Sequence, residues 1–295
     1  MTRRTLRGII PVIPTPLAGD ERVDAPALRR ILEYVIGEGV HGVWVLGSGG
    51  EHPNLEPAEA RRAIETAVET VAGRVPVVVG VGHPGTRMTI AAAREAAGMG
   101  ADMVNVVPPY YYAYSEEQCV RHYQMVLESV DVPLVIYRRG DPPMGLGSLE
   151  RVCQHPRVVA VKDVPSEFRV FQRMVATLGP LGVGVMTAAG RLIHPAVAVG
   201  GHGAVAVEAA IAPRLCLAIY EAALAGRNQE AAALQQKLYH LSNVLQVPPD
   251  HVSGLPKAAL SLLGFCAPTV TAPFRPAEPQ VLEKLRAALK AIGLL

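Results

Sequence analysis

Short runs of β-branched residues alternate with helical patterns along the first two-thirds of the chain. Several runs, including Val158–Val161, are apolar throughout, which is typical of parallel strands that are buried on both faces. Eight strands are expected, at residues 8–14, 42–46, 75–81, 103–107, 133–137, 158–162, 183–186 and 203–207. The intervening helices are expected at residues 24–36, 57–71, 85–97, 115–129, 148–155, 167–178, 192–199 and 213–225.

Eight alternations of strand and helix predict an α/β fold, the (β/α)₈ TIM barrel. A doubly wound sheet is the competing arrangement, but such sheets usually have fewer strands. The pattern stays helical after the eighth helix, at residues 228–245, 255–263 and 277–292. We therefore expect residues 1–226 to form the catalytic barrel domain. Residues 227–295 are expected to form a C-terminal helical extension that packs on the barrel.

Composition excludes several classes of protein. Half of the 295 residues are hydrophobic, which suits one large core and not a disordered chain. The net charge is only +2, with no basic block beyond the first seven residues, so no nucleic-acid partner is expected. No apolar run reaches the ~20 residues of a membrane helix. The absence of a signal-peptide pattern and of paired cysteines predicts a reduced, cytoplasmic protein.

Lys162 is the sharpest candidate for chemistry. It ends the apolar strand at residues 158–162, and the active sites of barrels lie at the C-terminal ends of the strands. Burial without a partner lowers the pKa of a lysine and yields a neutral amine, the nucleophile that forms a Schiff base with a carbonyl group. The alternative interpretation is a structural lysine that pairs with Asp163 or another acid.

Three other strand ends carry candidate residues. Tyr137 ends the strand that precedes the strand of Lys162, so its phenol could meet the amine or the substrate, or could serve only in packing. The loop Gly47–Glu51 allows close backbone approach, and its N–H groups could hold a carboxylate. A flexible turn in which Glu51 makes a structural hydrogen bond is the alternative there. The three tyrosines at residues 110–112 could line a pocket or cover the barrel mouth.

One motif suggests a cofactor but stands in the wrong place. Gly80–Gly85 matches GxGxxG, yet it belongs to the third strand–helix unit instead of the first, so a nicotinamide-dependent oxidoreductase is the weakest interpretation. The histidines have no metal-ligand spacing, and no Walker A or GxSxG motif occurs. No metal site is expected.

Taken together, these residues resemble the dihydrodipicolinate synthase / N-acetylneuraminate lyase family of class I lyases, which form a Schiff base. The resemblance covers nearly the whole chain and rests on GIIPVIPTPL, GSGGEHPNL, PPYYY, VIY, VVAVKD, GGHGAVAV and GLPKAALSLLG, in that order. It implies a (β/α)₈ barrel with C-terminal helices and a 2-oxo acid as substrate. It also implies a homo-oligomer, either a tetramer or a dimer, and no metal or organic cofactor.

The resemblance also implies roles for individual residues. Lys162 corresponds to the Schiff-base lysine, Tyr137 to the tyrosine that moves protons, and Tyr111 to a tyrosine that enters the proton relay across a subunit interface. Gly49 lacks the hydroxyl that the family has at this position. The expected substrate-binding residues are Ser48, Gly49, Arg139 and Val205.

Departures from the family pattern concern substrate choice. Pro142 stands where the synthase has the arginine that meets its second substrate, and the usual G-x-D after the seventh strand reads Ala188-Ala189-Gly190. Arg138 or Arg139 is the candidate for a second anionic group, and alternation along a strand favours Arg139. We therefore expect a lyase, as an aldolase, synthase or dehydratase, acting on pyruvate or another 2-oxo acid. The alternatives are 4-hydroxy-2-oxoglutarate aldolase or deoxy-oxo sugar acid dehydratase activity, or an inactive barrel that binds a ligand.

Overall fold

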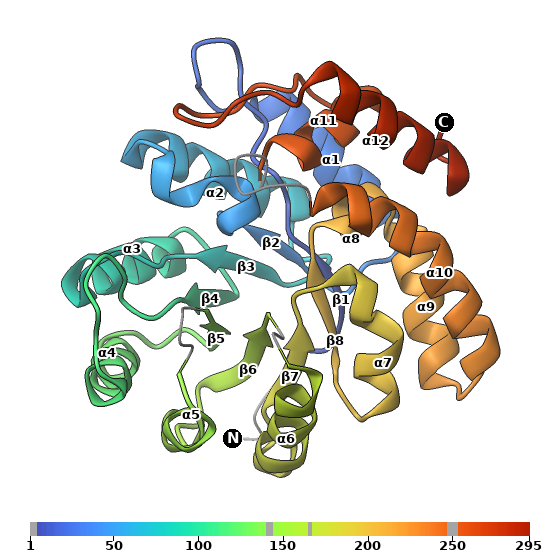
Figure 1. Cartoon of the computed structure of the whole chain (residues 1–295). Helices are drawn as coiled ribbons and strands as arrows, with labels where there is room; N and C mark the ends of the chain where they lie inside the picture. Colours follow the sequence, from blue (N-terminus) through green and yellow to red (C-terminus); the bar gives the residue numbers. More distant parts are fainter. Residues whose placement is uncertain (1–4, 140–143, 165–166, 247–252) are drawn as a thin grey trace.

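Eight parallel strands form a barrel in the computed structural model, which describes residues 5–139, 144–164, 167–246 and 253–295 (Figure 1). From β2 to β8 each strand pairs with the next along the chain, and β1 pairs with β8. A bridge between Val12 and Trp44 links β1 to β2 and closes the ring. The strands are β1 Gly8–Pro11, β2 Val43–Val45, β3 Val77–Gly80, β4 Met103–Val106, β5 Leu134–Arg138, β6 Val158–Asp163, β7 Gly184–Thr187 and β8 Gly203–Ala206.

Helices between the strands surround the barrel (Figure 1). Sequence signals fix where several begin: Asp24 accepts a hydrogen bond from the Ala27 N–H, and Ser115 forms a capping box with Gln118. The helices are α1 Ala25–Gly37, α2 Pro57–Val71, α3 Thr86–Gly98, α4 Glu116–Ser129, α5 Leu146–Cys153, α6 Phe168–Leu178, α7 Ile193–Ala198, α8 Glu208–Ile211 and α9 Pro213–Leu224. The predicted TIM barrel is confirmed, and a doubly wound sheet is excluded.

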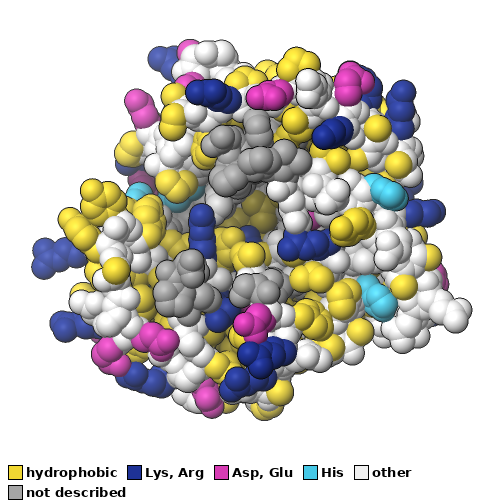
Figure 2. Space-filling view, viewed as in Figure 1, with side chains coloured by type: hydrophobic (Ala, Val, Ile, Leu, Met, Phe, Trp, Pro, Cys, Tyr) yellow, Lys and Arg dark blue, Asp and Glu magenta, His cyan; other side chains and the backbone are white. Residues whose placement is uncertain are grey.

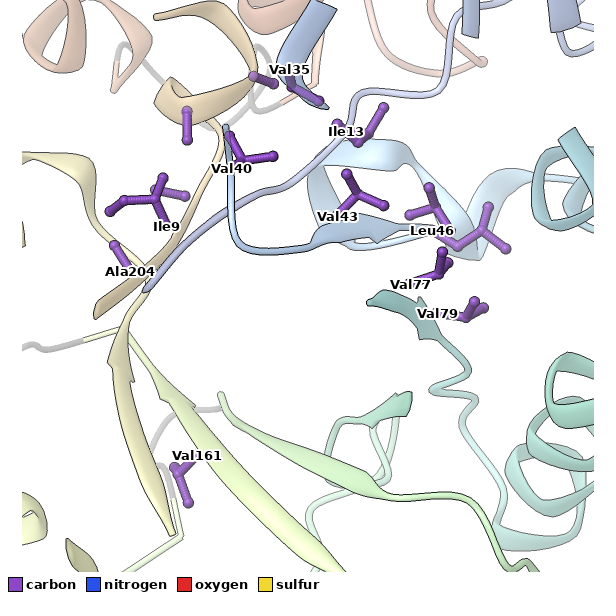
Figure 3. Close-up of a cluster of buried hydrophobic side chains, with 14 of the residues drawn as sticks. Ile9, Ile13, Val35, Val40, Val43, Leu46, Val77, Val79, Val161 and Ala204 are labelled. Carbon is purple, nitrogen blue, oxygen red and sulfur yellow. The ribbon is translucent and has the colours of Figure 1, made fainter. Parts of the chain in front are cut away.

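Alternation along the strands divides the buried side chains into two cores. Val77, Val79 and Val161 point outward and pack between the sheet and the helices (Figure 3). Val78, between the first two, points inward and belongs to a separate cluster that fills the barrel together with Val205. The phase of this alternation decides which polar side chains at the strand ends face the barrel axis.

Three further helices, α10 Asn228–Leu245, α11 Gly254–Leu262 and α12 Pro279–Ala291, follow the last strand–helix unit. Helix α10 packs against α7 and α9, and α11 contacts α8 (Figure 1). These helices therefore cover the side of the barrel where β8 meets β1. Among the described residues, no helix is both long enough and apolar enough to cross a membrane.

Candidate active site

Lys162 and Tyr137 are directly paired in the register of β6 and β5. The Lys162 Nζ lies 4.2 Å from the centre of the Tyr137 ring and 4.8 Å from the Trp44 ring. The next residues in each strand point the other way: Arg138 and Asp163 form a buried ion pair of 2.9 Å. Asp163 is therefore not the partner of Lys162. The alternative of a structural lysine that pairs with Asp163 is wrong.

The amine of Lys162 is buried without a carboxylate within ion-pair distance among the described residues. The pKa of Lys162 is lowered from 10.5 to about 7, mainly by burial and also by the nearby Arg139 guanidinium, while the Glu208 carboxyl acts in the opposite direction. With a pKa of about 7, roughly half of the amines are neutral at pH 7, against about one in three thousand for an ordinary lysine. Two aromatic faces attract an ammonium group by only ~2 kcal/mol when desolvated. They do not offset the effect of burial.

Ser48 connects Tyr137 to Arg139. The Arg139 Nη1 donates a hydrogen bond of 2.8 Å to the Ser48 Oγ, and the Ser48 side chain also hydrogen-bonds the Tyr137 phenol. Burial raises the pKa of Tyr137, while Arg139 and the Ser48 hydroxyl lower it. The phenol can act as a proton donor beside the Lys162 amine, whose Nζ lies 4.2 Å from the centre of its ring.

The loop after β2 presents backbone N–H groups next to this pair. The N–H groups of Gly50 and Glu51 donate to carbonyl groups of the same loop. Those of Ser48 and Gly49 have no backbone acceptor in the described part of the chain, so they can bind an anion. A Cβ atom at Gly49 would lie 3.5 Å from Val12, which is ordinary contact, so the missing hydroxyl is not a steric necessity.

A buried ion pair fixes the same loop from outside the barrel. The Lys257 Nζ, on α11, lies 2.5 Å from the Glu51 Oε1, and neither side chain is exposed. Glu51 also accepts hydrogen bonds of 2.7 Å from the N–H and the hydroxyl of Thr271. A further bond runs from the Ser253 hydroxyl to the Ser48 carbonyl oxygen. The C-terminal helices thus hold the loop that carries Ser48 and Gly49.

Two cavities meet at Tyr137 and Ser48, on the face of the barrel where the strands end. Basic side chains border the central hollow on this face (Figure 2). One cavity, of about 540 Å³, has Lys162 in its wall. The second, of about 520 Å³, lies toward β4 and is lined by Arg139 and the tyrosine segment at residues 110–112. The first cavity is lined by Val12, Ser48, Gly49, Tyr137, Lys162, Val164, Ala188, Ala189, Arg191, Val205, Val207, Glu208, Leu245 and Gln246.

Comparison with known proteins agrees with this geometry. The sequence model of the dihydrodipicolinate synthetase family matches residues 5–292. The chain is 35% identical to 4-hydroxy-tetrahydrodipicolinate synthase of Acidiphilium cryptum, over 98% of this chain and 99% of that protein. It is 34% identical to an uncharacterized DapA-like lyase of Halobacterium salinarum, over 98% and 95% of the two chains. The chain belongs to the dihydrodipicolinate synthetase family.

Solved structures of family members superpose closely. The crystal structure of dihydrodipicolinate synthase from Aquifex aeolicus aligns with a TM-score of 0.92 at 28% identity, over 98% of this chain and 99% of that one. YagE, an E. coli K12 prophage protein of the same family that was solved in complex with pyruvate, aligns with a TM-score of 0.94 at 25% identity, over 99% and 100%. Members of the family are class I lyases that use a pyruvate Schiff base. The resemblance drawn from the sequence is confirmed.

The family residues expected from the sequence do not all lie together. Lys162, Tyr137, Ser48, Gly49 and Val205 line one cavity. Arg139 lines the second cavity and reaches the first through Ser48. Tyr111 lies on the second cavity, is 85% exposed and has a φ of +86°. Pro142, which we expected at the position of the synthase arginine, lies outside the described residues.

The structure adds side chains that the sequence analysis did not select. Trp44 packs beneath the Lys162 amine, and Glu208 and Arg191 line the same cavity. The GxGxxG segment has a packing role in this family member. A Cβ atom at Gly80 would lie 2.0 Å from the Leu46 carbonyl oxygen, and one at Gly82 would lie 2.4 Å from Val107. These glycines therefore allow adjacent strand–loop units to touch, which explains the motif without a dinucleotide.

Proposed function

We propose that this protein is a lyase that forms an imine between Lys162 and a 2-oxo acid. The observation that carries the proposal is the buried amine of Lys162, which has no carboxylate at ion-pair distance in the described part of the chain and whose pKa of about 7 leaves it nucleophilic near neutral pH. Membership of a family of pyruvate-dependent Schiff-base lyases supports the same chemistry. A lysine that served only the fold would be expected to keep a carboxylate partner.

The geometry suggests an order of steps. The Lys162 Nζ adds to C2 of the 2-oxo acid and loses a proton, while Ser48 and the loop N–H groups hold the C1 carboxylate. The C2 hydroxyl then leaves as water with a proton supplied through Tyr137, which gives the imine. Removal of a proton from C3 gives an enamine. In the direction of synthesis the enamine attacks an aldehyde, and in the reverse direction the same enamine is formed when the C3–C4 bond is cleaved.

We also propose that the protein works as a homo-oligomer in the cytoplasm. Tyr111 supports the assembly, because a bulky residue at positive φ costs ~1–3 kcal/mol and persists only where its surroundings hold it. In this chain the Tyr111 side chain is largely exposed, with the Tyr112 ring beside it. Contact with a second copy would supply the missing constraint. It would also place Tyr111 for the relay role that the family resemblance implies.

Borohydride reduction in the presence of pyruvate tests the imine. We expect one reduced adduct per chain by mass spectrometry, and no adduct would overturn the proposal. A second measurement distinguishes an active enzyme from an inactive barrel that only binds a ligand. Active enzyme should exchange the C3 protons of pyruvate with deuterium in heavy water, because enamine formation removes them, whereas an inactive barrel would not.

We expect poor activity with pyruvate and aspartate semialdehyde. Pro142 supplies no cation for the carboxylate of the semialdehyde, and Gly49 supplies no hydroxyl for a proton relay. Loss of one charge-assisted contact weakens binding by about 10- to 100-fold. Turnover should therefore be higher with hydroxylated 2-oxo diacids or sugar acids. Turnover of the semialdehyde equal to that of the Acidiphilium cryptum enzyme would contradict this expectation.

A further inference from the structure

We propose that Arg191 and Glu208 bind the far end of the substrate, so that the enzyme selects 2-oxo acids with a hydroxyl group and a second carboxylate. The inference rests on the proposed function, because it places the 2-oxo group at Lys162. It goes further by assigning a subsite and a substrate class to the remaining part of the cavity.

The shape of the cavity directs the substrate toward these two residues. With the C1 carboxylate at Ser48 and Gly49 and C2 at Lys162, the rest of a 2-oxo acid can extend into the part of this cavity that lies beyond Lys162. The cavity continues past Ala188 and Ala189 to a wall formed by the ends of β7, β8 and α10. Arg191 and Glu208 supply the charged groups of that wall.

The Glu208 carboxyl group is buried in this wall and held there by a hydrogen bond. Only 5% of the residue is exposed, and its Oε1 accepts a hydrogen bond of 2.8 Å from the Ser242 hydroxyl on α10. Burial raises the pKa of the Glu208 carboxyl, while hydrogen bonds from its own backbone, from Ser242 and from Gly190 lower it. A carboxyl group held in this position can hydrogen-bond a substrate hydroxyl, and the Arg191 guanidinium in the same wall is the charge that meets a second carboxylate.

Gly190 makes room for this carboxyl group. A Cβ atom at residue 190 would lie 2.5 Å from the Glu208 Cδ and within 2.8 Å of both carboxyl oxygens, which is closer than atoms can pack. The family pattern G-x-D would place an aspartate at this position. In this chain an acidic group reaches the same space from the end of β8 instead of from the loop after β7. Any side chain at residue 190 would collide with the Glu208 carboxyl, so the two acids could not occupy this space together.

Arg191 is the cation of the subsite. Besides Lys162, it is the only basic side chain among the described residues that line this cavity. Arg139 lies near Lys162 but donates to Ser48. Within the described ranges Arg191 has no ion pair with a carboxylate, although the Glu208 carboxyl is close enough to feel its charge. A planar guanidinium is suited to bidentate binding of the second carboxylate of a diacid.

Competition in the borohydride reaction tests Arg191. 2-Oxoglutarate and 2-oxopentanoate have the same chain length and differ only in a terminal carboxylate or methyl group. We expect the wild-type protein to be trapped by the diacid at least about tenfold more readily at equal concentrations. Arg191→Gln should bring this ratio close to one. The control Arg173→Gln, on the exposed surface of α6, should keep the wild-type ratio.

Paired variants test the placement of Glu208. Gly190→Ala should lower the melting temperature, because its methyl group overlaps the Glu208 carboxyl, and Glu208→Ala added to it should restore the stability. The double variant should also reduce, by about tenfold, the ratio of kcat/KM for 4-hydroxy-2-oxoglutarate to that for its 4-deoxy analogue, both measured by deuterium exchange at C3. A double variant no more stable than Gly190→Ala, or one with an unchanged ratio, would show that Glu208 does not occupy the subsite.

The two proposals fail in different ways. If pyruvate gives no adduct with the wild-type protein, the imine chemistry itself is wrong. If pyruvate is trapped but the diacid and the monoacid react equally, the imine stands and the subsite is wrong. A diacid preference that survives Arg191→Gln also overturns the subsite, since the cation would then lie elsewhere.

Discussion

Lys162 in the barrel and Lys257 in the C-terminal helices are both buried lysines, but their surroundings give them opposite properties. Lys257 lies 2.5 Å from the Glu51 carboxylate and donates a hydrogen bond of 2.8 Å to the Thr269 carbonyl oxygen. Lys162 faces two aromatic rings and has no carboxylate at ion-pair distance among the described residues. Burial lowers the pKa of both amines, but Glu51 works against this effect only at Lys257.

The contrast shows that burial alone does not make a nucleophile. A buried ammonium with a carboxylate and a carbonyl acceptor is a structural cation, because its charge and its hydrogen-bond donors are satisfied. A buried amine without those partners gives up its proton near neutral pH. The same reagent or the same substitution should therefore have different effects at Lys162 and at Lys257.

Complete loss of imine formation is expected for Lys162→Ala. In the wild-type protein, peptide mapping after reduction with pyruvate and borohydride should place the adduct on Lys162. Lys257 should remain unmodified, because its amine is charged and closed off from the cavities. An adduct on Lys257 or Lys290 would contradict the assignment of Lys162 as the nucleophile. An adduct that persists in Lys162→Ala would contradict it too.

Loss of turnover by about 10²–10⁴-fold is expected for Tyr137→Phe, the usual range for a positioned acid–base group. Imine trapping at Lys162 should remain measurable, since the amine and its burial are unchanged. Deuterium exchange at C3 of pyruvate measures the step directly. A variant with near-normal exchange would leave Tyr137 as a packing residue against the Lys162 amine.

Opposite changes in stability are expected for Lys257→Met and Lys162→Met. Removing Lys257 leaves the buried Glu51 charge unpaired, which costs about 3–5 kcal/mol. The pKa of Lys162 is lower in the folded state than in the unfolded state, so folding at neutral pH releases protons from this group. The group therefore opposes folding at neutral pH. The stability of the fold rises as the pH increases from about 7 to 10.5. Lys162→Met removes this unfavourable group, so the variant should be more stable than the wild type by a few kcal/mol near pH 7.

Urea unfolding at pH 7 measures both changes in stability. Lys237→Met, on the exposed face of α10, is the matched control and should change the free energy of unfolding by less than about 0.5 kcal/mol. A Lys162→Met protein that is less stable than the wild type would indicate an ion-pair partner for Lys162.

A shallow pH dependence is the smallest expected effect. With a pKa of about 7, the neutral fraction of Lys162 rises about tenfold between pH 6 and pH 8 and changes little above that. An ordinary lysine would gain about a hundredfold over the same interval and continue to rise to pH 10. The initial rate of trapping at fixed pyruvate concentration distinguishes the two profiles.

Local patterns were enough to predict the fold. Each strand is a short β-branched run whose apolar side chains face either the barrel interior or the helices, so eight runs with eight helices leave few other solutions. The strand ends also pointed to Lys162 and Tyr137, because alternation along β5 and β6 sets the direction of each side chain. The same reasoning separated Arg139, beside Ser48, from Arg138, which pairs with Asp163.

Contacts between distant parts of the chain could not be predicted in this way. Glu208 stands in an apolar stretch that resembles any core segment, and its partners Gly190 and Ser242 come from other elements. For Glu51 the sequence indicates at most a structural hydrogen bond within its glycine-rich loop, and nothing near it in the sequence indicates Lys257 as its partner. Such pairs depend on how elements pack, and a periodicity within one element carries no information about them.

The tie between the loop after β2 and the C-terminal helices has a consequence for synthesis of the protein. Glu51 leaves the ribosome 220 residues before Thr271, one of the residues that hold it. At about 5–20 residues per second, this interval lasts roughly 10–40 s. During that time Lys162 has been made, but the loop expected to hold the substrate carboxylate lacks its anchors. A chain that ends before Thr271 therefore carries Lys162 without the contacts that hold the loop for the substrate carboxylate, so its binding site is incomplete.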